Sequence, residues 1–272
     1  METISILGCG WLGLPLGIYL VKKGYKVKGS TTEPDKLKVI KEKGIEPYLI
    51  ALTPEINGDN YDEFLNCAVL IIDFPPERRD DIIEYHQDQI KSLISAIERG
   101  TVKHAIFTSS TSVYPYVNQE VYEVPEPKPT KSSGKALMKV ENLLRESHKF
   151  KTTIIRFGGL IGYDRMPGQF LAGKKGVANG DAPVNLIHRD DCIQIIYKII
   201  RNNIWGETFN ACADLHPTRK EYYTQQAELI GLTPPAFNES KASKFKIVSN
   251  KKLKKLLNYK FKYPDPAKIL EN

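Results

Sequence analysis

The sequence predicts an α/β fold built on a doubly wound parallel sheet, and three observations support that class. Short β-rich apolar runs alternate with longer helical patterns through residues 1–160, a glycine-rich turn follows the first run, and long irregular segments follow two later ones. Such alternation is typical of a parallel sheet with helices on both faces. The six expected strands are Thr3–Leu7, Tyr25–Gly29, Glu46–Ile50, Ala68–Ile72, Ala105–Thr108 and Thr153–Phe157.

Helical patterns fill the gaps between these strands, which makes the prediction a Rossmann-type fold. The irregular segments 114–130 and 158–183 both follow a strand, at the carboxyl edge of the sheet where such folds bind ligands. We therefore expect a dinucleotide-binding domain at 1–183 and a small α/β cap at 184–272. The expected helices are Trp11–Lys23, Asp35–Lys43, Arg78–Arg99, Ser133–His148, Asp190–Arg201 and Arg219–Ile230, and a strand of the cap is expected at Thr208–Ala211.

Composition excludes several other classes of protein. The chain has 272 residues, of which 41% are hydrophobic and 26% charged, as in ordinary globular proteins. Its four cysteines form no CxxC pair, which excludes a disulfide scaffold and a zinc knuckle and suits a reducing cytosol. Its five histidines show no metal-ligand spacing, so we expect no metal.

The net charge of +7 comes from the end of the chain. Residues 241–272 hold ten lysines and two acidic residues, a net +8, so residues 1–240 sum to −1. These lysines flank Leu253, Leu256 and Leu257, a pattern that favours a solvated surface helix with one apolar side over a nucleic-acid or membrane contact.

An uncharged stretch from Ile4 to Val21 has the length of a membrane span. Its four glycines and its proline, together with the absence of a basic region before it, favour a strand, a turn and a helix instead. We expect a cytoplasmic protein without a membrane segment.

The turn after the first strand reads Gly8-Cys9-Gly10-Trp11-Leu12-Gly13, a GxGxxG pattern. The first glycine permits a tight turn, the second lets the backbone approach a pyrophosphate, and the third lets helix and strand pack closely. The string is weak when it stands alone, but here a strand precedes it and a helix follows it. The motif therefore predicts dinucleotide binding, against the alternative of a glycine turn that serves packing only.

The end of the second strand bears on which dinucleotide binds. NAD sites commonly place an acid about 20 residues after the glycines, to hold the ribose 2′-hydroxyl. This strand ends Gly29-Ser30-Thr31-Thr32, whose hydroxyls would tolerate a 2′-phosphate, although no arginine is present to hold one. The pattern favours NADP over NAD, and Glu33 is the alternative acid if the turn is longer.

A family resemblance begins at Phe107–Tyr114, which is similar to the SSxxVYG segment of extended short-chain dehydrogenases/reductases, the nucleotide-sugar epimerase/dehydratase family. Ile155–Gly162 resembles that family's RxGxxxG, and Val184–Asp191 its VxxxHVxDV segment. Thr208-Phe209-Asn210 resembles its cap strand, and Leu253–Tyr263 its closing segment. The resemblance spans nearly the whole chain. It implies a nucleotide along Gly8–Gly13, Ser30–Thr32, Ser109 and the turn Phe74-Pro75-Pro76, and a homodimer formed through Arg78–Arg99 and Ser133–His148.

The family's chemistry uses a serine or threonine and a Tyr-x-x-x-Lys pair, whose lysine lowers the pKa of the phenol. By resemblance Ser110 holds the serine position, but Ser133 and Leu137 stand where the tyrosine and lysine belong, counted from Glu141. The first loop also departs from the family's GxxGxxG. The chain thus resembles an atypical short-chain dehydrogenase/reductase without the catalytic pair.

Replacements for the missing pair are few. Tyr114 opens the loop expected over the nicotinamide, and His188 has a side chain that titrates near neutrality. A packing role for Tyr114 and a structural role for His188 are the alternatives. Lys135 is a further candidate, and the alternative is that it is a solvated surface lysine. Arg156 and Arg165 could bind a substrate phosphate or carboxylate, and the alternative for each is a structural ion pair.

These observations leave two hypotheses. The first is an NAD(P)-dependent oxidoreductase or epimerase that acts on a polar carbonyl or sugar-like small molecule, with Ser110, Tyr114 and His188 as the catalytic candidates. The second is a non-catalytic NAD(P)-binding sensor or scaffold, which the missing pair motivates.

Overall fold

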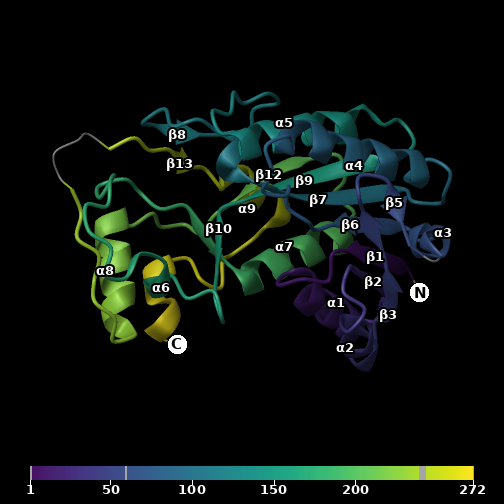
Figure 1. Cartoon of the computed structure of the whole chain (residues 1–272), viewed down its shortest axis with the longest axis horizontal. Helices are drawn as coiled ribbons and strands as arrows, with labels where there is room; N and C mark the ends of the chain where they lie inside the picture. Colours follow the sequence, from purple (N-terminus) through teal and green to yellow (C-terminus); the bar gives the residue numbers. More distant parts are fainter. Residues whose placement is uncertain (1, 59, 239–242, 272) are drawn as a thin grey trace. The chain divides into compact units, whose positions relative to one another are not determined.

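The computed structural model describes residues 2–58, 60–238 and 243–271 (Figure 1). The chain forms two compact units that interleave along the sequence. Unit 1 comprises Met1–Val113, Glu126–Arg156 and Ile196–Thr208, and unit 2 comprises Tyr114–Pro125, Phe157–Ile195 and Phe209–Asn272. The single boundary after residue 183 expected from the sequence falls inside unit 2.

A seven-stranded sheet in the order β12-β9-β7-β6-β1-β2-β3 forms the centre of the fold. The pairs β1–β2, β1–β6, β2–β3 and β6–β7 are parallel, and the strand order reverses at β1. All six strands expected from the sequence form, which confirms the predicted class. The bounds of the seven strands in this sheet are Thr3–Leu7 (β1), Lys26–Thr31 (β2), Glu46–Leu49 (β3), Val69–Ile72 (β6), His104–Ser110 (β7), Lys151–Phe157 (β9) and Thr208–Ala211 (β12).

The position of β12 corrects one expectation. The sequence placed Thr208–Ala211 in the cap, whereas the structure adds it to the edge of the main sheet beside β9. Backbone bonds explain the placement, because the N–H of Ile154 donates to the carbonyl of Glu207 at 2.8 Å and that of Gly158 to Ala211 at 2.9 Å.

Helices cover the sheet as its continuous apolar strands require, since β1 and β6 are buried on both faces. Helix α1 packs against β1 and β2, α2 against β2 and β3, and α5 against β7, while α4 and α5 pack together. Each expected helix is present with slightly shorter or shifted ends. The helices are Gly13–Lys22 (α1), Lys36–Glu42 (α2), Tyr61–Leu65 (α3), Ile82–Ile97 (α4), Ser132–Glu146 (α5), Arg189–Arg201 (α7), Arg219–Leu229 (α8) and Lys251–Leu257 (α9).

Unit 2 has a small core of its own, formed by Ile161, Val184, Leu186 and Tyr222. Around this core are short elements that the sequence did not predict, including two parallel two-stranded pairs, β10–β11 and β13–β8. Their bounds are Gly159–Ile161 (β10), Leu186–His188 (β11), Glu120–Val121 (β8) and Ile247–Val248 (β13), and Gly168–Leu171 forms helix α6. In unit 1, Ala51–Leu52 (β4) and Ile56–Asn57 (β5) form an antiparallel pair.

The lysine-rich segment forms the surface helix α9 that the sequence indicated. Leu253 and Leu257 are buried and Leu256 is exposed. Lys251 pairs with Glu120 at 3.1 Å. Helix α9 is therefore anchored by its buried leucines, while its lysine side lies at the surface. Lys241 lies outside the described residues.

Nowhere in the described parts of the chain is there a helix both long enough and apolar enough to cross a membrane. The uncharged stretch from Ile4 to Val21 is divided between β1, the glycine turn and α1.

Candidate functional site: a cavity at the glycine loop

The glycine loop joins β1 to α1, and two of its glycines are required by the protein's own packing. Gly8 has a φ of +109°, and a Cβ there would lie 2.3 Å from the carbonyl oxygen of Asp73. A Cβ at Gly13 would lie 2.1 Å from the carbonyl oxygen of Gly8. Any other residue at either position must displace backbone, so these two glycines fix the turn.

Gly10 differs from its two neighbours in the motif. A Cβ built on Gly10 meets nothing within 4 Å, and the residue is exposed. The chain itself therefore gives no steric reason for a glycine at this position. A ligand that approaches the backbone closely would give one, which is how the second glycine acts in a dinucleotide loop. The loop fits a pyrophosphate on this count.

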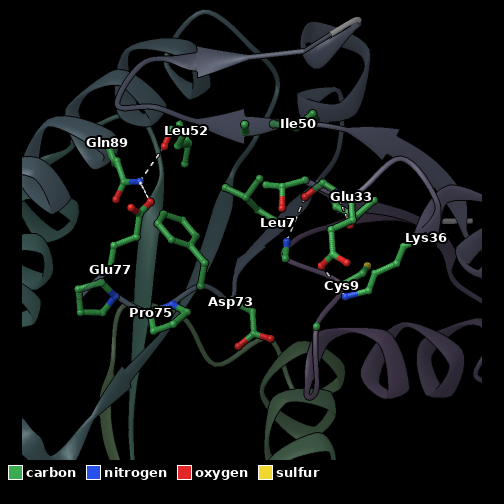
Figure 2. A pocket seen from close by; sticks show the side chains of 18 of the residues that line it. Leu7, Cys9, Glu33, Lys36, Ile50, Leu52, Asp73, Pro75, Glu77 and Gln89 are labelled. Carbon is green, nitrogen blue, oxygen red and sulfur yellow. Dashed lines mark hydrogen bonds and ion pairs between the residues drawn. The ribbon is translucent and has the colours of Figure 1, made fainter. Parts of the chain in front are cut away.

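A cavity of about 650 Å³ opens beside the loop, within unit 1 (Figure 2). Its walls come from the carboxyl ends of β1, β2 and β6 and from the segment after β3. This is the edge at which doubly wound sheets bind ligands, close to the strand where the order reverses. The predicted nucleotide residues that line it are Gly8, Gly10, Ser30, Thr31, Thr32, Phe74, Pro75 and Pro76.

The end of β2 presents one hydroxyl that is exposed and two that are buried. The Ser30 hydroxyl accepts from the N–H of Gly8 at 3.0 Å, and the Thr31 hydroxyl accepts from the N–H of Glu33 at 3.1 Å. Thr32 is exposed. Two charged residues beyond Thr32 also line the cavity and form an ion pair at 2.6 Å: Glu33 and Lys36. The sequence analysis gave Glu33 as the alternative acid and did not consider Lys36. This side of the cavity thus holds a carboxylate and an ammonium group in contact.

The opposite wall is apolar with a polar border. Phe74 packs edge-on against His86, with ring centroids 5.5 Å apart. Gln89 of α4 donates to the carbonyl of Leu52 at 2.7 Å, as Figure 2 shows. The lining on this side is therefore mainly apolar, with the Gln89 amide at its edge.

Asp73 is a cavity residue that the sequence analysis missed. It follows β6 directly, and its Oδ1 accepts from the hydroxyl of Thr108 at 2.8 Å. Burial, together with the charge of Asp73, raises the pKa of the neighbouring Cys9 thiol to about 12. Cys9 is therefore an uncharged wall residue at neutral pH.

Ser109 and Ser110 sit in different surroundings. The Ser109 hydroxyl is buried and donates to Oε1 of Glu141 at 2.6 Å, so it serves an internal cluster. The Ser110 hydroxyl is half-buried and accepts from the N–H of Ser112 at 3.1 Å. Neither Ser109 nor Trp11, Leu12 or Gly13 is among the residues that line the cavity.

Helix α5 carries no replacement for the missing catalytic pair at its usual positions. Ser133 is half-buried, and Leu137 is an apolar core residue. Lys135 is exposed, as a surface lysine should be. Arg156 is fully buried and paired with Glu141, so this arginine forms a structural ion pair.

Tyr114 and His188 belong to unit 2, whereas Ser110 belongs to unit 1. The Tyr114 hydroxyl is buried and donates to Oδ1 of Asn210 at 2.8 Å. Lys246, also buried, donates to the Tyr114 carbonyl at 2.6 Å. The grouping of Ser110, Tyr114 and His188 in one active site stays a prediction.

His188 lies between two aromatic rings, with its centroid 3.9 Å from that of Tyr263 and 5.5 Å from that of Tyr163. Its Nδ1 accepts from the N–H of Asp190 at 3.2 Å. Burial lowers its pKa below the ordinary histidine value. A Cβ on Gly162 would lie 2.3 Å from Nε2, so this ring is tightly enclosed in the structure.

Among the residues the structure describes, no group of three or more histidine, cysteine, aspartate or glutamate side chains is arranged to hold a metal ion.

Comparisons with known proteins identify one related protein family. No protein-family model matches the chain. Protein YeeZ of Escherichia coli K12 is 35% identical over 269 residues, which cover 98% of both chains. The chain belongs to the YeeZ family.

Solved structures share the fold of this YeeZ-family chain, among them a member of the short-chain dehydrogenase/reductase superfamily. A member of that superfamily from Agrobacterium tumefaciens, solved with bound NAD, superposes with a TM-score of 0.80 at 18% identity, over 99% of this chain and 95% of the other. UDP-glucuronic acid 4-epimerase from Bacillus cereus, solved with UDP-glucuronic acid and NAD, gives 0.78 at 18% identity, over 99% and 96%.

Proposed function

We propose that the cavity of unit 1 binds a nicotinamide dinucleotide, with its diphosphate on the loop from Gly8 to Gly13. The observation that carries the proposal is Gly10, a glycine that faces open space beside a cavity of about 650 Å³. The backbone N–H groups at the start of α1 supply the partial positive charge that an anion prefers. The two structural neighbours described above were solved with NAD, which supports the same ligand here.

We further propose that the ribose subsite accepts a 2′-phosphate, and therefore NADP. The sequence analysis found no arginine for this phosphate, and Lys36, which lines the cavity with the exposed Thr32, would supply the cation. Glu33, its partner, would instead hold a free 2′-hydroxyl. Replacement of Lys36 by methionine should weaken NADP more than NAD, while Glu33→Gln should weaken NAD more than NADP. Lys38→Met, on the same helix but outside the cavity, is the control.

The reaction we propose is hydride exchange between the dinucleotide and a polar carbonyl or sugar-like small molecule. The nicotinamide, when bound, supplies the hydride chemistry. The Ser110 hydroxyl, half-buried at the end of β7, would donate a hydrogen bond to the carbonyl oxygen of the substrate. Tyr114 and His188 remain the candidates for proton transfer.

Calorimetry with purified, ligand-free protein tests the binding proposal. NAD⁺, NADH, NADP⁺ and NADPH are titrated in turn, and we expect binding with the NADP forms favoured. Absence of heat for all four at millimolar concentration would refute a dinucleotide site.

Turnover is tested separately, with NADPH absorbance followed in the presence of a panel of aldehydes, ketones and nucleotide sugars. Ser110→Ala should abolish most of the turnover found, while Ser112→Ala, two residues further along, should retain it. Equal activity of the two variants would remove Ser110 from the mechanism.

A non-catalytic sensor is the second candidate, and the specific observation in its favour is the core residue Leu137 where the catalytic lysine belongs. Tight binding of reduced and oxidised dinucleotide, with no turnover of any carbonyl in the panel, would favour the sensor over the enzyme.

A further inference from the structure

Asp73 occupies a position that matters for any anion on the glycine loop. Its backbone N–H donates to the carbonyl of Leu7 at 2.9 Å, which fixes the residue beside the end of β1. Its Oδ2 lies 3.1 Å from the point where a Cβ on Gly13 would stand, and its carbonyl oxygen lies 2.3 Å from the corresponding point on Gly8. The carboxylate is therefore close to the first and third glycines of the motif, and it lines the same cavity.

The carboxylate is held in place by β7. Its Oδ1 accepts from the Thr108 hydroxyl at 2.8 Å, a contact between two neighbouring strand ends. A residue of the same shape without the charge, asparagine, keeps an oxygen that can accept this hydrogen bond. The charge can thus be removed while the acceptor for the Thr108 hydroxyl is kept.

The groups that face Asp73 can be named element by element. The glycine loop contributes the Cys9 thiol, which is uncharged at neutral pH, and β7 contributes the Thr108 hydroxyl. The other charged residues that line the cavity are the Glu33–Lys36 pair, between the end of β2 and the first residue of α2, and Glu77 and Arg78 on the segment after Asp73 itself.

A diphosphate on the loop would bring two further negative charges into a cavity that already holds this carboxylate. Like charges in a partly enclosed site disfavour the ionised form of a carboxyl group. We propose that Asp73 couples binding of the diphosphate to uptake of a proton, so that this residue sets how tightly the site holds an anionic ligand. The inference rests on the proposed dinucleotide site.

The sign of the coupling follows from linkage. The bound diphosphate raises the pKa of Asp73 above its value in the free protein, so the complex carries more protons between those two values. Affinity is highest below the free-protein value and falls as pH rises toward the value in the complex. Above that value it is constant and weak, because both states are ionised.

Two ligands separate the diphosphate from the rest of the nucleotide. ADP-ribose carries the diphosphate as a diester, which keeps its charge over the pH range used, and adenosine carries no phosphate. Both are titrated into wild-type protein and Asp73→Asn by calorimetry between about pH 5 and about pH 8. Buffers of different ionisation enthalpy report the protons taken up on binding.

We expect Asp73→Asn to bind ADP-ribose at least about tenfold more tightly than wild type near pH 8, the change that one unit of pKa coupling gives. The variant should also lose the proton uptake and most of the pH dependence. Adenosine should bind both proteins equally at every pH. Asp88→Asn removes the same charge from an exposed position on α4 that does not line the cavity, and should leave ADP-ribose binding near the wild-type value.

Equal affinity and equal proton uptake of wild type and Asp73→Asn would overturn the role of Asp73 while the dinucleotide site stands. Failure of both proteins to bind ADP-ribose at millimolar concentration would overturn the site and the coupling together. Should Asp73→Asn not fold, as judged by its thermal transition, Asp73→Ala provides the same comparison without the charge.

Discussion

Glu141 and Arg156 form an ion pair inside unit 1, with 2.6 Å between Oε2 of the glutamate and Nη2 of the arginine and no exposure of either side chain. The hydroxyl of Ser109 donates to the same carboxylate at 2.6 Å, and Arg145 approaches it at 2.8 Å. Helix α5 is thereby joined to β7 and β9. Glu141, the residue from which the family's catalytic positions were counted, acts here as the centre of a structural cluster.

Removing one partner of this pair should destabilise the protein strongly. Arg156→Met leaves Glu141 buried without its main counter-charge, and the expected loss is about 3–5 kcal/mol of unfolding free energy. Urea unfolding measures it. The double variant Arg156→Met with Glu141→Leu should lose clearly less than the sum of the single variants, because no buried charge is left unpaired. Strictly additive losses would contradict this account.

The exposed pair of Lys91 and Asp88, 3.0 Å apart, is the matched control. Both side chains are more than half exposed, so solvent screens their interaction. Lys91→Ala should change the unfolding free energy by no more than about 1 kcal/mol.

The glycines of the loop should separate folding from binding. Gly13→Ala places a Cβ against the Gly8 carbonyl and should lower the melting temperature markedly, because backbone must move. Gly10→Ala adds a Cβ in open space and should melt as the wild type does. Its affinity for a nicotinamide dinucleotide should nevertheless fall at least about tenfold, which is about 1.4 kcal/mol. Wild-type affinity of Gly10→Ala would mean that the diphosphate does not contact the loop.

The main sheet was predictable because its signals are local. The strands β1 and β6 are continuous apolar runs, and helices such as α4 carry a clear apolar stripe, so both types follow from periodicity. The short strands of unit 2 carry no such signal. Ile247–Val248 is held in part by Asn185, whose side chain accepts from the N–H of Val248 at 2.8 Å across 63 positions of sequence.

The residues that line the cavity were also predictable only where the signal is local. Gly8 and Ser30 were found because each directly follows a predicted strand, and Phe74 came from the family resemblance. Asp73 had the same signal, since it directly follows the run that ends at Ile72, and could have been included. Gln89 could not, because it lies in the middle of a helix and reaches the cavity only through the packing of α4.

The cysteines should be inert in the folded protein. All four are buried, and burial raises the pKa of Cys9 and of Cys212 to about 12, so almost no thiolate is present near pH 8. A disulfide reagent such as DTNB should label none of them within minutes, and all four after unfolding in guanidinium chloride. Rapid labelling of Cys9 alone would show that the glycine loop opens in the native state.

Stability should decrease in mild acid because histidines that are buried or half-buried resist protonation. Burial lowers the pKa of His86, His104, His188 and His216. In the unfolded chain these groups take up protons near about pH 6.5, whereas in the folded protein they do so only at lower pH. Their contribution is therefore complete above that pH and is lost as pH falls from it toward the folded-state values.

His86 is the sharpest test of this behaviour, because its side chain is fully buried and its Nε2 has no hydrogen-bond partner within the described structure. Its Nδ1 lies 3.1 Å from Oε1 of Gln89. His86→Gln removes one group that binds a proton in the unfolded chain but not in the folded protein. The slope of unfolding free energy against pH should therefore decrease by up to about 1.4 kcal/mol per pH unit below about pH 6.5. Urea unfolding at a series of pH values measures the slope. His148→Gln, which removes an exposed imidazole, is the matched control. If His86→Gln left the slope unchanged, His86 would be protonated in the folded protein as readily as in the unfolded chain.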